Sequence, residues 1–209
     1  MAEHYFTAHE DLDERSFTPE PLRVELAGRS RDLLTAPGIF SPRGIDKGTA
    51  VLLAEAPTPV GDSLMDIGCG WGPLALTLGL MRPEAQVTAV DVNHRSLELV
   101  RRNAVHLGLG RVTAQLPDQV DPRLGFDTIW SNPPIRVGKE ILHGILITWL
   151  PRLNPGGSAY LVVQKNLGAD SLLRWLDREL PEGLSARRHA AAKGFRLLEV
   201  SRTGRTAAS

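Results

Sequence analysis

From Ser63 onward the chain alternates between two patterns, and this alternation constrains the fold more than any other feature. Short apolar runs bounded by Gly, Pro or Asp are each followed by a longer segment with helical periodicity. The pattern predicts an α/β sheet of parallel strands joined by crossover helices. The predicted strands are 64–67, 86–90, 111–114, 126–130 and 158–163. The predicted helices are 73–81, 95–106, 139–150 and 171–180.

The alternation stops after Pro181. Two strand-like runs, 184–189 and 195–202, are separated by only 190–194, which is too short for a crossover helix. We expect them to pair antiparallel as a hairpin at one sheet edge, which makes a seven-stranded, mostly parallel sheet.

The part of the chain before residue 60 predicts a small extension. Runs 24–26 and 32–34 flank an Ala27-Gly28 turn and predict a hairpin, and 46–55 predicts a helix with Asp46 as its N-cap. Residues 1–21 show no periodicity. We therefore divide the chain into an N-terminal extension, 1–60, and a core domain, 61–209.

The 24 basic and 24 acidic residues of the 209-residue chain balance, so the whole molecule has no strong attraction to nucleic acid. The charges are nevertheless uneven, because residues 1–25 carry seven acids and residues 184–209 carry six bases. Cys69 is the only cysteine, which excludes an intramolecular disulfide and a cysteine-rich metal site. The sequence also lacks a membrane-spanning run and a signal peptide, and we expect a soluble, cytoplasmic protein without a metal.

A glycine-rich loop directly follows the predicted strand 64–67. Asp66 lies in that strand, and Gly68, Gly70 and Gly72 follow it in a G-x-G-x-G spacing. Glycines let a backbone approach a ligand closely, and this spacing is one residue tighter than the dinucleotide-binding G-x-G-x-x-G. The loop favours a ligand without phosphates, and the alternative is that the glycines serve only a tight turn.

Three further residues belong to this candidate site. Asp91 ends the second predicted strand, where a carboxylate can accept hydrogen bonds from both ribose hydroxyls of a nucleoside. Asp118 follows the third strand and is either an acceptor for an adenine amino group or a plain turn residue. Cys69 has no activating neighbour in sequence, and we interpret it as a small packing side chain of the loop.

A second stiff loop, Asn132-Pro133-Pro134-Ile135, follows the strand 126–130. Two prolines fix successive φ angles and remove two backbone donors, so the corner offers acceptors. The Asn132 side-chain oxygen and the Pro133 carbonyl could hold the two hydrogens of a planar NH2 group. This would direct the nitrogen lone pair toward an electrophile, and the alternative is an ordinary edge turn.

The chain resembles the small-domain methyltransferases at positions spread along almost its whole length. This family includes RsmC-type guanine-N2 methyltransferases of ribosomal RNA. The resemblance is carried, in order, by His4-Tyr5-Phe6, Phe40-Ser41, Asp46, Gly48-Thr49, Asp91-Val92-Asn93, Ser131 to Arg136, Gly138-Lys139, Gln164-Lys165, Gly168-Ala169 and Lys193-Gly194-Phe195-Arg196. The resemblance implies a Rossmann-like class I methyltransferase fold.

The resemblance also implies a cofactor, S-adenosylmethionine, and roles for individual residues. It implies that Asp66 and the three glycines line the methionine end, with Cys69 beside them, that Asp91 and Val92 contact the ribose, and that Asp118 contacts the adenine. The implied amine site is Asn132, Pro133, Pro134 and Ile135, with Asn132 also beside the cofactor. The implied substrate contacts are Phe40, Arg136, Lys139 and Lys165.

Two departures from the family matter for the substrate. RsmC proteins carry a second, degenerate methyltransferase-like domain ahead of the catalytic one, for which this chain has no room. Many relatives also place an aromatic residue after Asn-Pro-Pro, where this chain has Ile135.

The leading hypothesis is methylation of the exocyclic N2 of a guanine in ribosomal RNA, with the small subunit favoured. The partner would then be ribosomal RNA or a ribosomal subunit, and we expect a monomer. One alternative is transfer to adenine N6 or to a protein glutamine amide. Another is a non-catalytic RNA-binding or assembly module with the same fold.

Overall fold

The computed structural model describes residues 17–204. The His4-Tyr5-Phe6 match and five of the seven acids of residues 1–25 lie outside these described residues, whereas Glu20 and Glu25 lie within them. Within residues 17–204, no helix is both long and apolar enough to cross a membrane.

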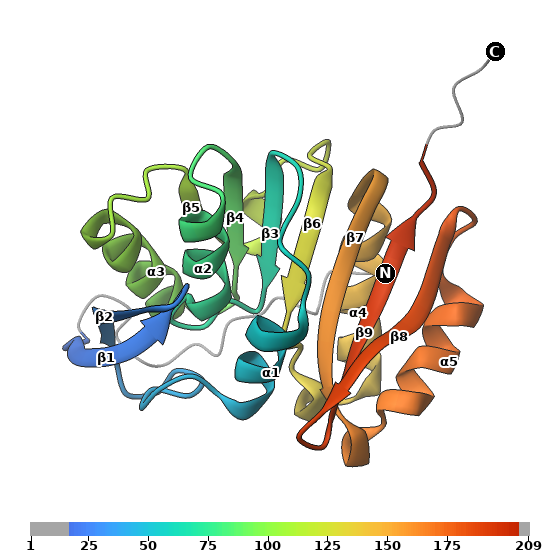
Figure 1. Cartoon of the computed structure of the whole chain (residues 1–209), viewed down its shortest axis with the longest axis horizontal. Coiled ribbons are helices and arrows are strands. Elements are labelled where there is room, and N and C mark those ends of the chain that lie inside the picture. Colours follow the sequence, from blue (N-terminus) through green and yellow to red (C-terminus); the bar gives the residue numbers. More distant parts are fainter. Residues whose placement is uncertain (1–16, 205–209) are drawn as a thin grey trace.

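A seven-stranded sheet forms the centre of the protein, with the strand order β5-β4-β3-β6-β7-β9-β8 (Figure 1). The strands β3 to β7 of this sheet are mutually parallel, and β9 runs antiparallel to both β7 and β8. The predicted mostly parallel sheet with a C-terminal antiparallel hairpin is thus confirmed. The strands are β3 (Ser63–Ile67), β4 (Gln86–Val90), β5 (Val112–Gln115), β6 (Phe126–Ser131), β7 (Leu153–Gln164), β8 (Leu184–Ala192) and β9 (Phe195–Arg202).

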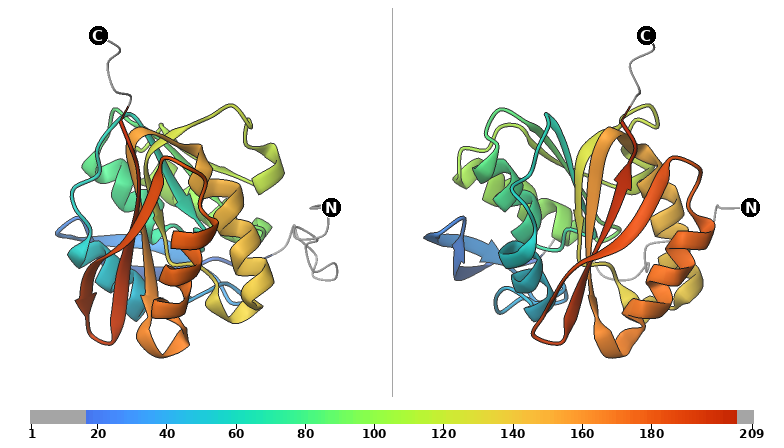
Figure 2. Two further views of the ribbon diagram at one scale, coloured as in Figure 1. Left: turned by 90° about the vertical axis from the view of Figure 1, so that its right-hand side faces the viewer. Right: turned by 45° about the vertical axis from the view of Figure 1, so that its right-hand side comes forward.

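Helices cover both faces of the sheet and bury two apolar clusters against it. Val51, Leu74 and Val100 come from three different helices and share one cluster on one face. Leu146 and Leu172 belong to the cluster on the other face. Figure 2 shows α1 on one side of the sheet and α4 and α5 on the other. The helices are α1 (Lys47–Glu55), α2 (Pro73–Met81), α3 (His94–His106), α4 (Lys139–Trp149) and α5 (Ala169–Glu179).

The small predicted hairpin is β1 (Glu20–Leu26) paired with β2 (Arg29–Thr35). Ala27 and Gly28 have φ of 48° and 72°, the left-handed pair that a two-residue hairpin turn needs. The hairpin packs on α2 and α3 from outside, which explains why α2 is apolar all round: Leu74 and Leu78 face the sheet, and Leu76 faces the hairpin cluster.

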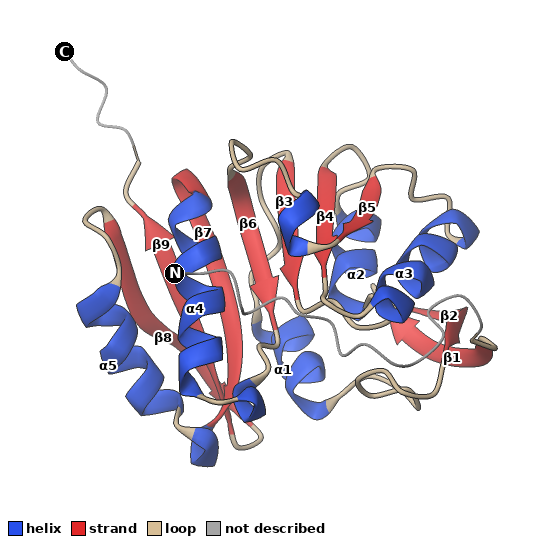
Figure 3. Ribbon diagram, turned by 180° about the vertical axis from the view of Figure 1, so that it is seen from behind, coloured by secondary structure: helices blue, strands red, loops and turns tan. Residues whose placement is uncertain are grey.

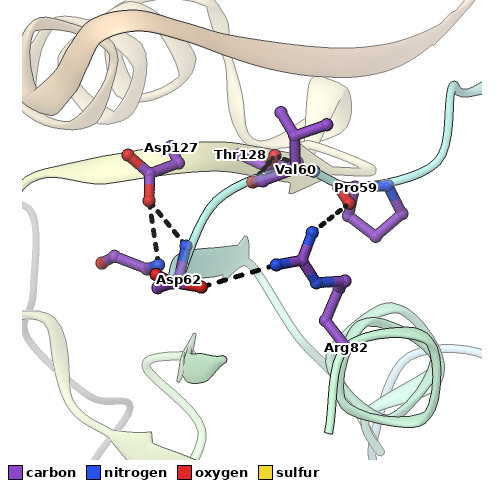
Figure 4. Close-up of polar contacts among 7 residues, drawn as sticks. Pro59, Val60, Asp62, Arg82, Asp127 and Thr128 are labelled. Carbon is purple, nitrogen blue, oxygen red and sulfur yellow. Dashed lines mark hydrogen bonds and ion pairs between the residues drawn. The ribbon is translucent and has the colours of Figure 1, made fainter. Parts of the chain in front are cut away.

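The linker between α1 and β3 is tied to the start of β6 (Figure 4). Oδ2 of Asp127 accepts hydrogen bonds from the backbone N–H groups of Asp62 (2.8 Å) and Ser63 (3.0 Å). Thr128 Oγ1 donates to the carbonyl of Val60 over 2.8 Å. The domain boundary between residues 60 and 61 stays a prediction. The linker is hydrogen-bonded to β6 on both sides of this boundary, at Val60 and at Asp62.

Both strands of the small hairpin are longer than predicted, 20–26 against 24–26 and 29–35 against 32–34. Two strands of the central sheet are also clearly longer than their predicted spans. β7 begins at Leu153 rather than 158, because Leu153 already pairs with Phe126 of β6. The turn-like stretch Asn154-Pro155-Gly156-Gly157 is part of the strand and contains the register shift that precedes the pair Thr128–Ser158. β8 continues to Ala192 past a bulge between Arg188 and Ala190, so the hairpin turn is only Lys193-Gly194. Both cases are bulges that keep the pairing while interrupting the local pattern.

Candidate functional site

The two singled-out loops meet where the strand order reverses. The chain runs from β3 outward through β4 to β5 and then returns to β6 on the other side of β3. Ile67 and Ser131, the last residues of β3 and β6, are directly paired, and Ser131 Oγ donates to the Ile67 carbonyl over 2.8 Å. Ligands of open α/β sheets bind at such a reversal, beyond the carboxyl ends of the strands, which is the lower edge in Figure 1.

Two of the three glycines of the loop have free space where a side chain would stand. Gly68 (φ 74°) and Gly70 (φ 54°) have left-handed backbones, and a Cβ at Gly68 would meet no atom within 4 Å, while one at Gly70 would meet only the Phe40 carbonyl at 3.9 Å. Gly72 differs, because a Cβ there would lie 3.0 Å from Val100 Cγ2. Gly72 therefore serves helix packing as the N-cap of α2 and does not line the pocket, contrary to expectation.

Asp91 connects the glycine loop to the end of β4. Its Oδ2 accepts the backbone N–H of Gly70 over 2.9 Å, and its Oδ1 accepts that of Asn93 over 2.9 Å. Burial raises the pKa of Asp91, and the backbone donors Asn93, Gly70 and Val92 oppose this rise. A carboxylate has about four acceptor sites on its two oxygens, so the group can still accept a hydrogen bond from a ligand.

Asp66 is placed differently from expectation. It is fully buried behind the loop, its Oδ2 accepts the N–H of Ala75 in α2 over 3.0 Å, and its buried Oδ1 has no hydrogen-bond partner. Burial raises the pKa of Asp66 to about 8, against the Ala75 hydrogen bond and with the added effect of the Asp91 charge. Asp66 supports the loop from beneath and is not part of the pocket wall.

Cys69 lies between Gly68 and Gly70, and its side chain is buried. Burial, followed by the charges of Asp91 and Asp66, raises the pKa of its thiol well above the ordinary value. A thiol of raised pKa is a poor nucleophile, which agrees with a packing role.

The two loops line one shared pocket, which holds about 330 Å³ of unfilled space including its open mouth. Phe40 is 61% exposed at this pocket, whereas Trp71 is buried. The indole N–H of Trp71 donates to the carbonyl of Ser41 over 3.2 Å and so holds the Phe40 loop. The lining residues are Phe40, Ser41, Asp46, Thr49, Gly68, Cys69, Gly70, Trp71, Pro73, Leu74 and Asn132.

The Asn132 amide is fixed by the start of α1. Its Nδ2 donates to Asp46 Oδ2 over 2.9 Å and to Thr49 Oγ1 over 3.0 Å. The Pro133 carbonyl accepts the backbone N–H of Ile135 over 2.8 Å, which uses one of its two lone pairs.

The last two residues of this loop face different surroundings. Pro134 is exposed, and Ile135 is half-buried against the cluster that contains Leu142 and Leu146. Ile135 therefore packs against the core and is not among the residues that line the pocket, and its place at the amine site stays a prediction.

The remaining predicted residues lie around the same edge of the sheet and outside the pocket wall. Val92 is 45% exposed after β4, and Asp118 is exposed in a short 3-10 helix, Pro117–Gln119, after β5. Arg136, Lys139 and Lys165 are exposed after β6 and β7.

Sequence reasoning missed the contact between Asp46, Thr49 and Asn132. Asp46 was expected only as a helix cap, which it is, accepting the Gly48 N–H over 2.7 Å. A local pattern reveals a cap, but the partner 86 residues away depends on how α1 packs on the sheet.

The residues in and around this pocket suit an adenosyl sulfonium cofactor. Gly68 and Gly70 leave space for a ligand, and several lining residues are apolar. Asp91 is not a lining residue, but its carboxylate binds the Gly70 N–H from the end of the neighbouring strand. Among residues 17–204, no group of three or more His, Cys, Asp or Glu side chains could hold a metal ion.

Comparisons with known proteins agree with this architecture. The family model "Methyltransferase small domain" matches residues 30–197. An uncharacterized protein, YbxB, of Bacillus subtilis (strain 168) is 30% identical over 186 residues, which are 87% of this chain and 91% of that protein. The ribosomal RNA small subunit methyltransferase C of Pseudomonas entomophila (strain L48) is 33% identical over 191 residues, 88% of this chain and 54% of that enzyme.

A solved structure has the same fold. It is the 16S rRNA N2 G1207 methyltransferase (RsmC) of T. thermophilus in complex with AdoMet and guanosine, with a TM-score of 0.72 and 22% identity over 90% of this chain and 51% of that one. This chain thus spans about half the length of these ribosomal RNA methyltransferases. The match of the family model over most of the sequence, with the Rossmann-like fold, places the chain in the methyltransferase small domain family.

Proposed function

We propose that this protein is an S-adenosylmethionine-dependent methyltransferase that methylates the exocyclic N2 of a guanine in ribosomal RNA, with the small subunit favoured. The observation that carries the proposal is that Gly68, Gly70 and Asn132 line one shared pocket. The similarity to ribosomal RNA methyltransferases, and a neighbour whose structure holds AdoMet and guanosine, support the substrate class.

S-adenosylmethionine supplies an activated methyl group on a positively charged sulfur. Gly68 and Gly70 would admit its methionine end, because neither backbone carries a Cβ that would fill this space. Asp91 would accept the ribose hydroxyls with its remaining lone pairs. Asp118 would receive the adenine amino group at the end of β5.

The acceptor nitrogen would be held by oxygens. Oδ1 of Asn132 and the carbonyl of Pro133 would accept the two hydrogens of its planar NH2 group. Both partial negative charges would then stabilise the positive charge that develops on nitrogen as it is methylated. No strong base is needed for this step, because positioning and charge stabilisation act before the nitrogen loses its proton.

Phe40 favours a planar ring as the bearer of that NH2 group. Since Ile135 packs into the core, Phe40 is the strongly exposed aromatic side chain of the pocket wall. Aromatic side chains stack on unpaired bases, and a base that reacts in such a pocket must be unpaired or flipped out. This observation favours a nucleobase over the glutamine amide of a protein, whereas adenine N6 remains the second candidate.

The basic residues at the same edge would contact the flanking RNA backbone. Arg136, Lys139 and Lys165 are exposed on loops that follow β6 and β7. Such contacts position nucleic acid without reading its sequence. A ribosomal substrate implies a cytoplasmic enzyme, and we propose that it acts as a monomer.

The test uses purified protein, labelled S-adenosylmethionine and ribosomal subunits from cells that lack the gene. We expect labelled N2-methylguanosine in small-subunit RNA after nuclease digestion and mass analysis. Label in N6-methyladenosine would identify the second candidate, and label in protein would identify a peptide substrate. If cofactor binds but no label is transferred to RNA or protein, the proposal is wrong.

A further inference from the structure

Asp46 lies next to the amide on which the proposed reaction depends. We propose that Asp46, with Thr49, is a positioning residue that holds the Asn132 amide with its oxygen available to the acceptor amine. The inference rests on the proposed function, since it explains how the acceptor site of that reaction is oriented.

The contacts are made from the first turn of α1 to the end of β6. Asn132 Nδ2 carries two hydrogens, and it donates to Asp46 Oδ2 (2.9 Å) and Thr49 Oγ1 (3.0 Å). The two donor hydrogens are therefore both used. Among the described residues, no hydrogen bond occupies Oδ1 of Asn132, so this oxygen keeps its acceptor capacity.

Carboxylate chemistry decides which end of the amide faces α1. An ionised carboxylate only accepts hydrogen bonds, so an amide turned by 180° would set its own oxygen against Asp46 Oδ2. That arrangement is repulsive and would present NH2 hydrogens to the acceptor amine. Asp46 thus excludes the orientation in which Asn132 could not hold an NH2 group.

Asp46 is itself held rigidly. The same Oδ2 atom caps α1 by accepting the N–H groups of Gly48 (2.7 Å) and Thr49 (3.4 Å). Helix α1 in turn buries Val51 and Leu52 against the sheet. A positioning group needs such support, because catalytic geometry tolerates little displacement.

Gly48 provides the space that this arrangement requires. A Cβ at this position would lie 3.0 Å from Asp46 Oδ2, 3.1 Å from Phe195 Cε1 and 3.3 Å from Asn132 Oδ1. Its φ is not in the left-handed region, so close approach, not backbone conformation, accounts for the glycine.

The negative charge of Asp46 gives a second benefit. A carboxylate bound to the NH2 end polarises the amide and increases the negative partial charge on Oδ1. The oxygen then binds more strongly to a nitrogen that becomes positive in the transition state than to a neutral one. Loss of Asp46 should accordingly lower kcat more than it changes cofactor binding.

The first test replaces Asp46 while keeping the helix cap. Ser is as good an N-cap as Asp, but its side chain is too short to reach Asn132. For D46S we expect kcat to fall by about 10- to 100-fold, with the Kd for S-adenosylmethionine within about twofold of wild type. The isosteric T49V should lower kcat by a smaller factor. Unchanged kcat in a folded D46S protein would overturn the inference.

Exchanging the carboxylate at position 46 and the amide at position 132 distinguishes a positioning role of Asp46 from a purely structural one. N132D places a carboxylate against Asp46 and should be almost inactive. In the D46N/N132D double variant, the amide introduced at position 46 can donate to the carboxylate introduced at position 132, which restores the contact with its direction reversed. We expect the double variant to exceed N132D by at least about tenfold in kcat. A double variant no better than N132D would contradict the proposal.

A measurement that does not depend on catalysis tests the Asp46–Asn132 contact separately from the proposed function. The side-chain NH2 signals of Asn132, assigned by their absence in N132D, should shift and exchange faster with solvent in D46S. G48A should shift them as well, whereas G110A should not, because a Cβ at Gly110 would meet nothing within 4 Å. Unmoved signals would refute the Asp46 contact, while a wild-type protein that transfers no methyl group would refute only the function.

Discussion

The backbone N–H of Gly70 donates a 2.9 Å hydrogen bond to Oδ2 of Asp91, so the glycine loop after β3 is held by the residue that ends the neighbouring strand. The same carboxylate fixes Asn93, the N-cap of α3. One side chain thereby orients the backbone on both sides of the proposed cofactor site.

Replacement of Asp91 should weaken cofactor binding. D91A removes the acceptor for Gly70 and for the ribose hydroxyls, and we expect the Kd for S-adenosylmethionine to rise by about 10- to 100-fold. Calorimetry measures this change. Burial raises the pKa of Asp91, so acidification should protonate this carboxylate at a higher pH than an ordinary aspartate. The affinity of the wild-type protein for the cofactor should therefore begin to fall at that higher pH. Wild-type affinity in D91A would show that the carboxylate does not contact the cofactor.

Gly68 should be needed for ligand binding, beyond the backbone conformation that it allows. G68A and G108A carry a similar strain, because φ is 74° at Gly68 and 70° at Gly108, and neither Cβ would meet an atom within 4 Å. Each should lose about 1–2 kcal/mol of unfolding free energy. Only G68A should also lose affinity for S-adenosylmethionine. Equal affinities of the two variants would remove Gly68 from the cofactor site.

Phe40 should affect the RNA substrate and leave the cofactor bound. F40A should lower kcat/KM for RNA by about tenfold or more, since stacking on one base contributes about 1–3 kcal/mol. F40W should retain activity, and its indole fluorescence should be quenched when RNA binds. V105A is the matched control, because Val105 is an apolar side chain that is 83% exposed outside the pocket. Full activity of F40A would exclude stacking.

Asp66 should make stability depend on pH. Its pKa is about 8 in the folded protein against an ordinary value of 3.8, so the folded state binds one more proton between these values. The stabilisation is complete below the lower pKa and is lost as the pH rises through the higher one. The slope should reach about 1.4 kcal/mol per pH unit in the free energy of unfolding.

Urea unfolding at several pH values measures this slope. D66N keeps an oxygen for the Ala75 N–H, cannot ionise, and should lack the decline. D177N, which removes an exposed carboxylate on α5, should retain it. Parallel curves for wild type and D66N would mean that Asp66 is ionised in the folded protein.

Local patterns were enough for most of the architecture. The predicted helix 73–81 coincides with α2, because Pro73 and the preceding glycines mark its start. The C-terminal hairpin follows from a link too short for a crossover, and the structure narrows its turn to Lys193 and Gly194, which have left-handed backbones. Strand limits were less accurate in β1, β2, β7 and β8. In β7 and β8 a register shift interrupts the pattern without ending the pairing.

The order of strands and helices along the chain, and the two loops that follow β3 and β6, could be read from local patterns, since these depend on periodicity and on the backbone limits of Gly and Pro. Which side chains reach the pocket depends on the packed fold. It buries Asp66 beneath the loop, turns Ile135 into the core and brings Asp46 to Asn132 across 86 residues. Such contacts depend on how α1 and α4 pack on the sheet (Figure 3), and packing is a property of the whole fold that no local pattern contains.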